Sequence, residues 1–172
     1  MVHFMKPAPL PALQELCKVI EYEGDTGVFR NISRRSASAP AGAITGCRAK
    51  SGYVSIRYKK RLYLAHRLAW LFAHMQDPAD LDVDHINGDP SDNRICNLRL
   101  ATRRQNLLNG KRPVTNTTGF KGVFKNQRGK YVGRIRGLKG IEETASYLTA
   151  EEAAEAYSEL ASRIAGEFAR TQ

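Results

Sequence analysis

A polar stretch in the middle of the chain limits what its surroundings can fold into. Residues 83–89 read Val-Asp-His-Ile-Asn-Gly-Asp, and a loop rich in Pro, Ser, Asp and Asn follows them. Asp84 and His85 are adjacent at the end of a short apolar run, directly before these turn-forming residues. The alternation in residues 98–100, Leu-Arg-Leu, predicts a returning strand. The segment is therefore predicted to form a strand, a loop, a second strand and a helix.

Two asparagines complete the pattern, because Asn97 lies 12 residues and Asn106 lies 21 residues after His85. Asn106 falls on the predicted helix, where its amide can face back toward Asp84 and His85. Carboxylate and amide oxygens are hard ligands of the kind that Mg²⁺ accepts, together with water and phosphate oxygens. A histidine with a pKa near neutrality can deprotonate water for attack on phosphorus. These side chains would suffice for metal-assisted phosphodiester hydrolysis.

The compound pattern over residues 63–109 resembles the ββα-metal nuclease motif of HNH endonucleases, in the HNN variant of phage and intron homing enzymes. The resemblance implies that His85 is the general base. It implies that Asp84 and Asn106 hold one divalent ion, Mg²⁺ or Mn²⁺, in each active centre. Asn97 would be the middle asparagine, which fixes the loop and the orientation of the histidine.

Charge and composition indicate the class of partner. The chain of 172 residues carries 27 Lys and Arg against 17 Asp and Glu, a net charge of +10, which favours a polyanion such as double-stranded DNA. Its three cysteines are far apart and form no Cys-x-x-Cys pair, which disfavours a disulfide framework and a zinc site and fits a reducing cytoplasm, bacterial or phage-infected. No apolar run approaches the roughly 20 residues of a membrane span, so we expect no membrane partner.

The fold class predicted is α+β, with an N-terminal ββα-metal module and a C-terminal three-stranded antiparallel sheet packed on one helix. The predicted limits are a loose tail at 1–11, a nuclease domain with an N-terminal β extension at 12–108, a linker at 109–118 and a DNA-binding domain at 119–172. Upstream of the motif, a hairpin is expected over residues 53–64. Lys59 and Lys60 at its tip either contact phosphate or form a solvated edge. Arg67 either reaches a phosphate or solvates a helix.

The C-terminal region shows an uneven distribution of charge. Strand candidates at 120–124, 130–136 and about 142–147 precede a helix that opens with Thr149 and Glu152 as a capping box. Strand alternation places Lys130, Arg134 and Arg136 on one face of the sheet. The helix would pack on the other face with its acidic residues outward. A basic sheet face of this kind can enter a DNA groove.

This arrangement, with Phe-Lys-Gly-Val at 120–123 and Gly-Lys-Tyr at 129–131, resembles the AP2 DNA-binding domain. Several Arg and Trp positions of plant AP2 domains differ here, so their target sequence is not carried over. An alternative is a basic, solvated sheet that only supports the nuclease. The residues expected to contact DNA across the whole chain are Lys59, Lys60, Arg67, Arg103, Lys111, Arg112, Lys121, Lys125, Arg128, Lys130, Arg134 and Arg136.

The leading hypothesis is therefore a two-module endonuclease in which the HNH unit cuts and the AP2-like unit binds the target. One active centre per chain favours a nick in one strand, and a double-strand cut would need a second chain or a second binding event. The oligomeric state, monomer or homodimer, stays open. A second hypothesis is a sequence-specific DNA-binding regulator with a silent nuclease module, and a third is a structure-specific or RNA nuclease.

Overall fold

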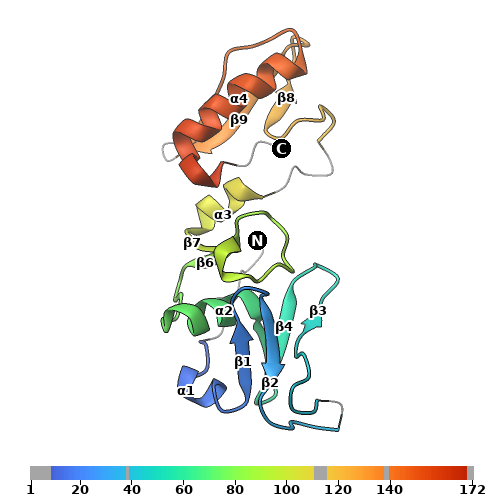
Figure 1. The fold of residues 1–172 in the computed structure, drawn as a ribbon. Coiled ribbons are helices and arrows are strands. Elements are labelled where there is room, and N and C mark those ends of the chain that lie inside the picture. Colours follow the sequence, from blue (N-terminus) through green and yellow to red (C-terminus); the bar gives the residue numbers. More distant parts are fainter. Residues whose placement is uncertain (1–8, 38, 111–115, 138–139, 170–172) are drawn as a thin grey trace. The chain divides into compact units, whose positions relative to one another are not determined.

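The computed structural model describes residues 9–37, 39–110, 116–137 and 140–169, and the chain forms two compact units, Met1–Thr102 and Arg103–Gln172 (Figure 1). Compact units and functional domains need not coincide, so the predicted domain limits stay a prediction. The predicted residues Lys111 and Arg112 lie outside the described residues.

The first unit opens with a short helix and a hairpin. Helix α1 (Leu13–Leu16) leads into β1 (Ile20–Glu23), which pairs antiparallel with β2 (Val28–Asn31). The turn between the two strands contains Gly24 and also Gly27, whose positive φ of 73° suits a glycine. Residues 20–31, the two strands and their turn, form the N-terminal hairpin.

A three-stranded antiparallel sheet comes next, in the order β3 (Cys47–Arg48), β4 (Val54–Tyr58) and β5 (Arg61–Leu64). The predicted hairpin over residues 53–64 is confirmed by the β4–β5 pairing. Its two-residue turn holds Lys59 at φ 44° and Lys60 at φ 67°, a left-handed pair of the kind that two-residue hairpin turns require. Helix α2 (Ala65–His74) begins directly after β5.

The predicted order of strand, loop, strand and helix is also found. Strand β6 (Asp82–His85) pairs antiparallel with β7 (Leu98–Ala101), and the 3-10 turn η1 (Ile95–Asn97) lies directly before β7. Residues 86–97 connect the two strands and form the active-site loop. Helix α3 (Arg103–Asn109) comes after β7 and belongs to the second compact unit.

One hydrophobic core joins the elements of the first unit. Leu16 and Ile20 come from its N-terminal part, Ile56 from β4 and Leu68 from α2, and each is fully buried. Burying one such side chain contributes about 1.5–3 kcal/mol. Val83 of β6 belongs to the same core. The N-terminal hairpin and the β6–β7 hairpin are therefore parts of one packed body.

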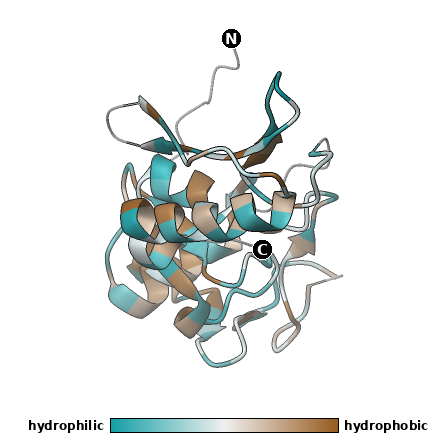
Figure 2. Cartoon of the chain, turned by 90° about the horizontal axis from the view of Figure 1, so that it is seen from above, coloured by the Kyte–Doolittle hydropathy of each residue, from teal (hydrophilic) through white to brown (hydrophobic). Residues whose placement is uncertain are grey.

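In the second unit, β8 (Val123–Lys125), β9 (Tyr131–Gly137) and β10 (Gly140–Glu143) form an antiparallel sheet in the order β10-β9-β8. Helix α4 (Ala150–Ala165) packs on β9 and β8 and is followed by the turn η2 (Gly166–Phe168). Hydrophobic and hydrophilic residues alternate along the helices (Figure 2). The acidic residues of α4 are exposed, as predicted.

The contact between α4 and the sheet depends on two glycines. Tyr157 of α4 lies where side chains at Gly122 and Gly133 would otherwise project, since a Cβ at Gly122 would come within 2.1 Å of its ring. The predicted capping box is confirmed, because the Thr149 side chain accepts from the Glu152 amide and the Glu152 carboxylate accepts from the Thr149 amide. Helix α4 therefore begins where local sequence indicates.

Two strand boundaries differ from the prediction. The first strand was expected at 120–124 but begins at Val123, because the chain turns at Gly122 with φ 73°. The third strand was expected at about 142–147 but spans Gly140–Glu143, and beyond it a hydrogen bond from the Thr144 amide to the Gly133 carbonyl oxygen and an isolated bridge from Tyr147 to Tyr131 continue the pairing. In the described residues, no helix is both long enough and apolar enough to cross a membrane.

Candidate active site

His85 ends strand β6 and lies under the active-site loop, with 5% of its surface exposed. Its Nε2 atom is 3.2 Å from Oδ1 of Asn93. The Asn93 amide is itself oriented, because its Nδ2 group donates to the carbonyl oxygen of Ser91 at 3.2 Å. The amide oxygen must therefore face the histidine ring, so Nε2 of a neutral His85 carries the hydrogen. Nδ1 is then the nitrogen that holds the basic lone pair.

The surroundings of His85 also favour the neutral form. Burial lowers the pKa of His85 below its usual value, although the Asn93 hydrogen bond and three nearby carboxylates oppose the shift. A general base has to be unprotonated at the working pH, and a lowered pKa meets this condition. The geometry therefore suits a base whose Nδ1 accepts a proton.

Asp84 precedes His85 on the same strand and is equally buried. Its Oδ2 atom accepts a hydrogen bond of 3.0 Å from Nε of Arg99, the residue directly opposite on β7. Both side chains are nearly inaccessible, with 5% of Asp84 and 12% of Arg99 exposed, so Arg99 brings a positive charge next to the carboxylate. Asp84 is thus held in place by Arg99 beside the histidine.

Asn97 ties the active-site loop together. Its Nδ2 group donates to Oδ1 of Asn87 at 3.0 Å and to the carbonyl oxygen of Asp92 at 2.9 Å, while its Oδ1 accepts from the Asn87 amide at 3.0 Å. These bonds match the loop-fixing role that the HNH resemblance implies. The direct bond to His85 comes from Asn93, which sequence reasoning missed because an Asn among turn residues resembles an ordinary turn former.

Two further side chains form a wall beside His85. The ring of His66 on α2 lies 5.0 Å from the His85 ring in a T-shaped arrangement, and the Tyr53 ring lies 6.0 Å from it. His66 is buried, and in the described part of the chain its Nδ1 has no hydrogen-bond partner. Burial, with His85 and Arg67 nearby, lowers the pKa of His66 to about 3. Both lowered pKa values favour neutral rings, so the two histidines do not repel each other.

Arg67 has neither of the two roles expected from sequence. The side chain is buried and donates to the carbonyl oxygens of Leu81 at 2.8 Å and Ala79 at 2.9 Å. Its guanidinium also lies 3.6 Å from the Asp77 carboxylate. Arg67 thus ties α2 to the segment that leads into β6, and the structure corrects its assignment as a phosphate contact or a solvating residue.

Lys59 and Lys60 are exposed at the tip of the β4–β5 hairpin. Tyr53, which lies near His85, precedes the opposite end of β4, so the tip is about 17 Å further along the strand. Nζ of Lys59 lies 3.7 Å from the Glu15 carboxylate and 5.3 Å from the Tyr58 ring centroid. The two lysines are therefore not beside His85, and their contact with phosphate stays a prediction.

The residues that fit a metal are few. In the described parts of the chain, no group of three or more His, Cys, Asp or Glu side chains could hold an ion. The two predicted ligands are Asp84 on β6, a hard carboxylate, and Asn106 on α3, an amide, and their joint binding of an ion stays a prediction. Such a sparse oxygen set suits Mg²⁺, which keeps several waters and takes phosphate oxygens as ligands. The expected proximity of Asn106 to Asp84 and His85 stays a prediction, as does the role of Arg103, exposed at the start of α3.

In the second unit, five of the predicted DNA-contacting residues lie exposed on or beside the sheet. Arg134 and Arg136 alternate with Ile135, which faces the core with Tyr157. Arg134 pairs with Glu143 at 2.6 Å, and its guanidinium lies 5.8 Å from the Phe124 ring centroid. The residues whose positions alternate with Ile135 form the basic face of the unit and are Lys130, Arg134 and Arg136, whereas Arg128 lies in the turn between β8 and β9 and Lys125 lies opposite Tyr131.

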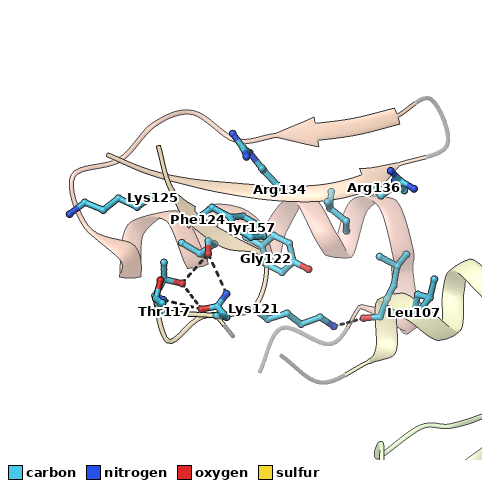
Figure 3. Close-up of a pocket in the computed structure, with 14 residues that line it drawn as sticks. Leu107, Thr117, Lys121, Gly122, Phe124, Lys125, Arg134, Arg136 and Tyr157 are labelled. Atoms are coloured by element: carbon cyan, nitrogen blue, oxygen red, sulfur yellow. Dashed lines mark hydrogen bonds between the residues drawn. The ribbon is translucent and has the colours of Figure 1, made fainter. Parts of the chain in front are cut away.

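Lys121 is the exception among these predicted residues. It is buried, and its ammonium group donates to the carbonyl oxygen of Leu108 near the end of α3 (Figure 3). The side chain lines a cavity of about 460 Å³ together with residues from β8, β9 and α4, including Phe124 and Tyr157. A lysine at a helix C-terminus stabilises the last carbonyls. The structure thus gives Lys121 a contact inside the unit, which corrects its expected place on the DNA face.

Comparisons with known proteins agree with the geometry of the site. The family model for HNH endonucleases matches residues 63–108. An uncharacterised HNH endonuclease of Acanthamoeba polyphaga mimivirus is 33% identical over 121 residues, which cover 70% of this chain and 62% of that protein. Protein 3.8 of Escherichia phage T7 is 39% identical over 80 residues, which cover 44% of this chain and 66% of that protein. No solved structure matches the chain. Residues 63–108 are therefore similar to the HNH endonuclease domain, and the chain spans less than two thirds of either relative.

Proposed function

We propose that this chain is a metal-dependent DNA endonuclease of the HNN variant, which hydrolyses a phosphodiester of double-stranded DNA. The observation that carries the proposal is the pair of His85 and Asp84 at the end of β6. The base is buried, has a lowered pKa and is oriented through Nε2 by Asn93, and the carboxylate beside it is held by Arg99. The HNH family match over residues 63–108 covers both residues.

In the proposed reaction, Nδ1 of His85 accepts a proton from a water molecule. The water oxygen forms a bond to phosphorus, the bond from phosphorus to the leaving oxygen breaks, and the leaving oxygen is protonated from solvent. Asp84 and Asn106 would hold the divalent ion, Mg²⁺ or Mn²⁺. When bound, the ion stabilises negative charge on the phosphate and on the leaving oxygen. Asn97 maintains the active-site loop around the base.

The second unit supports a proposal of target binding. Its basic face lies on the side of the sheet away from α4. The exposed acidic residues lie on α4, on the opposite side of the sheet. We therefore assign an AP2-like, DNA-binding role to this unit, with the site of cutting supplied by the first. One active centre per chain leads to a nick in one strand. We further propose a homing-type enzyme that acts in a bacterial or phage-infected cell, and the similarity to a protein of an Escherichia phage supports the setting.

The test is cleavage of a supercoiled plasmid pool that is varied enough to contain the target. Wild type, His85→Ala and the matched control His74→Ala are compared with Mg²⁺ or Mn²⁺ and with EDTA, since His74 is exposed at the end of α2. Open circles that need both the metal and His85 support the proposal, whereas linear products indicate paired centres. DNA binding without metal-dependent cutting favours the regulator with a silent nuclease module. Preferential cutting of RNA or branched DNA favours the third hypothesis.

A further inference from the structure

The N-terminal hairpin precedes the segment that the family model matches, yet it contacts the active-site loop directly. The Tyr22 hydroxyl on β1 donates to the carbonyl oxygen of Asn93 at 2.7 Å, across 71 residues of sequence. The Ile95 amide donates to the carbonyl oxygen of Gly24 at 3.0 Å. Two hydrogen bonds therefore fix the part of the loop whose side chain contacts His85.

A third contact comes from the turn of the same hairpin. A Cβ at Gly27 would lie 2.6 Å from the carbonyl carbon of Asn93 and 2.6 Å from the amide nitrogen of Arg94. Gly27 also has φ 73°, a conformation that residues with a side chain rarely adopt. The backbone of the loop thus rests against the hairpin at a distance that only glycine allows.

The donor in this arrangement is itself held in place. The Tyr22 ring packs 4.7 Å from the Phe29 ring centroid and 6.3 Å from that of Phe72. Burial raises the pKa of Tyr22 to about 12, so its hydroxyl keeps its proton across the physiological range. The Tyr22 ring packs against the hydrophobic core of the unit, and this packing holds its hydroxyl group next to the active-site loop.

We propose that the N-terminal hairpin positions the catalytic base, with Tyr22 and Gly27 holding Asn93 so that its side chain orients His85. The connection is short, because the Asn93 carbonyl accepts from Tyr22 and its side-chain oxygen contacts Nε2 of His85. Tyr22 and Gly27 are positioning residues, since neither is placed on substrate. The expected effect on cleavage rests on the proposed function. The orientation of the His85 ring by Asn93 and Tyr22 can be tested without any measurement of activity.

The experiment compares Tyr22→Phe and Gly27→Ala with matched controls in the full chain. Gly42→Ala is the control for Gly27, because Gly42 has a similar φ of 76° and no atom within 4 Å of its Cβ position in the described structure. Tyr63→Phe is the control for Tyr22, because Tyr63 is buried in the same core. Two readouts are taken: single-turnover cleavage of the plasmid pool with Mg²⁺, alongside DNA affinity, and the NMR resonances of the His85 imidazole.

We expect Tyr22→Phe to slow cleavage about ten-fold and Gly27→Ala to slow it about a hundred-fold, since small displacements of a catalytic group are costly. DNA affinity should stay within about two-fold, and the His85 resonances should shift in both variants and in neither control. Wild-type rates with unshifted resonances in Tyr22→Phe would overturn the inference while the nuclease proposal stands. If the wild type fails to cut, the nuclease proposal fails, and the imidazole resonances alone decide the positioning inference. Tyr22→Phe decides it even if Gly27→Ala does not fold.

Discussion

Asp84 and Arg99 face each other across the β6–β7 hairpin, and the Asp84 carboxylate accepts a hydrogen bond of 3.0 Å from the Arg99 guanidinium. Asp84 is buried and only 12% of the Arg99 side chain is exposed, so each is a close charge partner of the other. The carboxylate proposed to hold the metal is therefore already oriented in the folded protein. This pairing links the stability of the unit to the chemistry of its site.

Loss of Arg99 should destabilise the protein more than the loss of a surface arginine. Arg99→Gln removes the ion pair with the buried Asp84 carboxylate, and breaking a buried pair in this way costs about 3–5 kcal/mol. Urea unfolding of Arg99→Gln and of Arg94→Gln measures the difference, since Arg94 is exposed. Added Mg²⁺ should restore more stability to Arg99→Gln than to wild type if the carboxylate binds the ion. Equal losses in both variants would contradict the assigned role of the pair.

Substitution of the proposed metal ligands should separate cutting from binding. Asp84→Asn keeps an oxygen acceptor for Arg99 but removes the charge, and Asn106→Ala removes an amide oxygen. Both should abolish plasmid cleavage and leave DNA affinity nearly unchanged, because the ion acts mainly in the transition state. Cleavage rates and affinity, measured on the same preparations, test this. A parallel collapse of affinity and of the unfolding midpoint would show instead that these residues are structural.

The pH dependence of cleavage follows from the lowered pKa of His85. The base works in its neutral form, so the rate should rise with pH through a midpoint below 6.5 and stay level above it. A bound divalent cation would disfavour the imidazolium form and move the midpoint further in the same direction. Single-turnover rates from acidic to neutral pH measure the curve. A midpoint above 6.5 would be inconsistent with the burial of this histidine.

His66 should make the folded state sensitive to acid. Its pKa is lowered to about 3 in the folded protein, against a usual value near 6.5, so the unfolded chain binds the extra proton between these values. Stability is therefore lost as the pH falls from 6.5 toward 3, with a slope of up to about 1.4 kcal/mol per pH unit from this group. Urea unfolding across this range should show a weaker slope in His66→Phe. His74→Phe, the exposed control, should retain the wild-type slope.

The basic face of the second unit should determine DNA affinity and its salt dependence. Arg134→Ala or Arg136→Ala should weaken binding, by about 1–3 kcal/mol if the side chain reads a base, and a phosphate contact should lower the salt slope by about 1. Arg163→Ala removes the same charge from α4, where the side chain is 74% exposed, and should leave the slope unchanged. Fluorescence anisotropy at several salt concentrations distinguishes these outcomes. Equal salt slopes in all three variants would indicate that DNA binds to another surface of the protein.

The sequence by itself determined the elements that depend on neighbouring residues. The capping box of Thr149 and Glu152 starts α4 because its two hydrogen bonds span three residues, and the alternation around Ile135 separates a basic face from a core face. The order of strand, loop, strand and helix around Asp84 and His85 came from turn residues and short-range alternation in the same way. Local propensity and local pattern act over a few residues, so a sequence shows them directly.

Only the tertiary structure decided which polar side chains face inward and which partners they meet. Asn93 rather than Asn97 contacts His85, and Arg67 and Lys121 turn inward to bind carbonyl oxygens. Tyr22 meets Asn93 across 71 residues. These contacts form because a buried polar group must find a partner wherever the packed core places one. That placement depends on the whole unit, and no short stretch of sequence carries it.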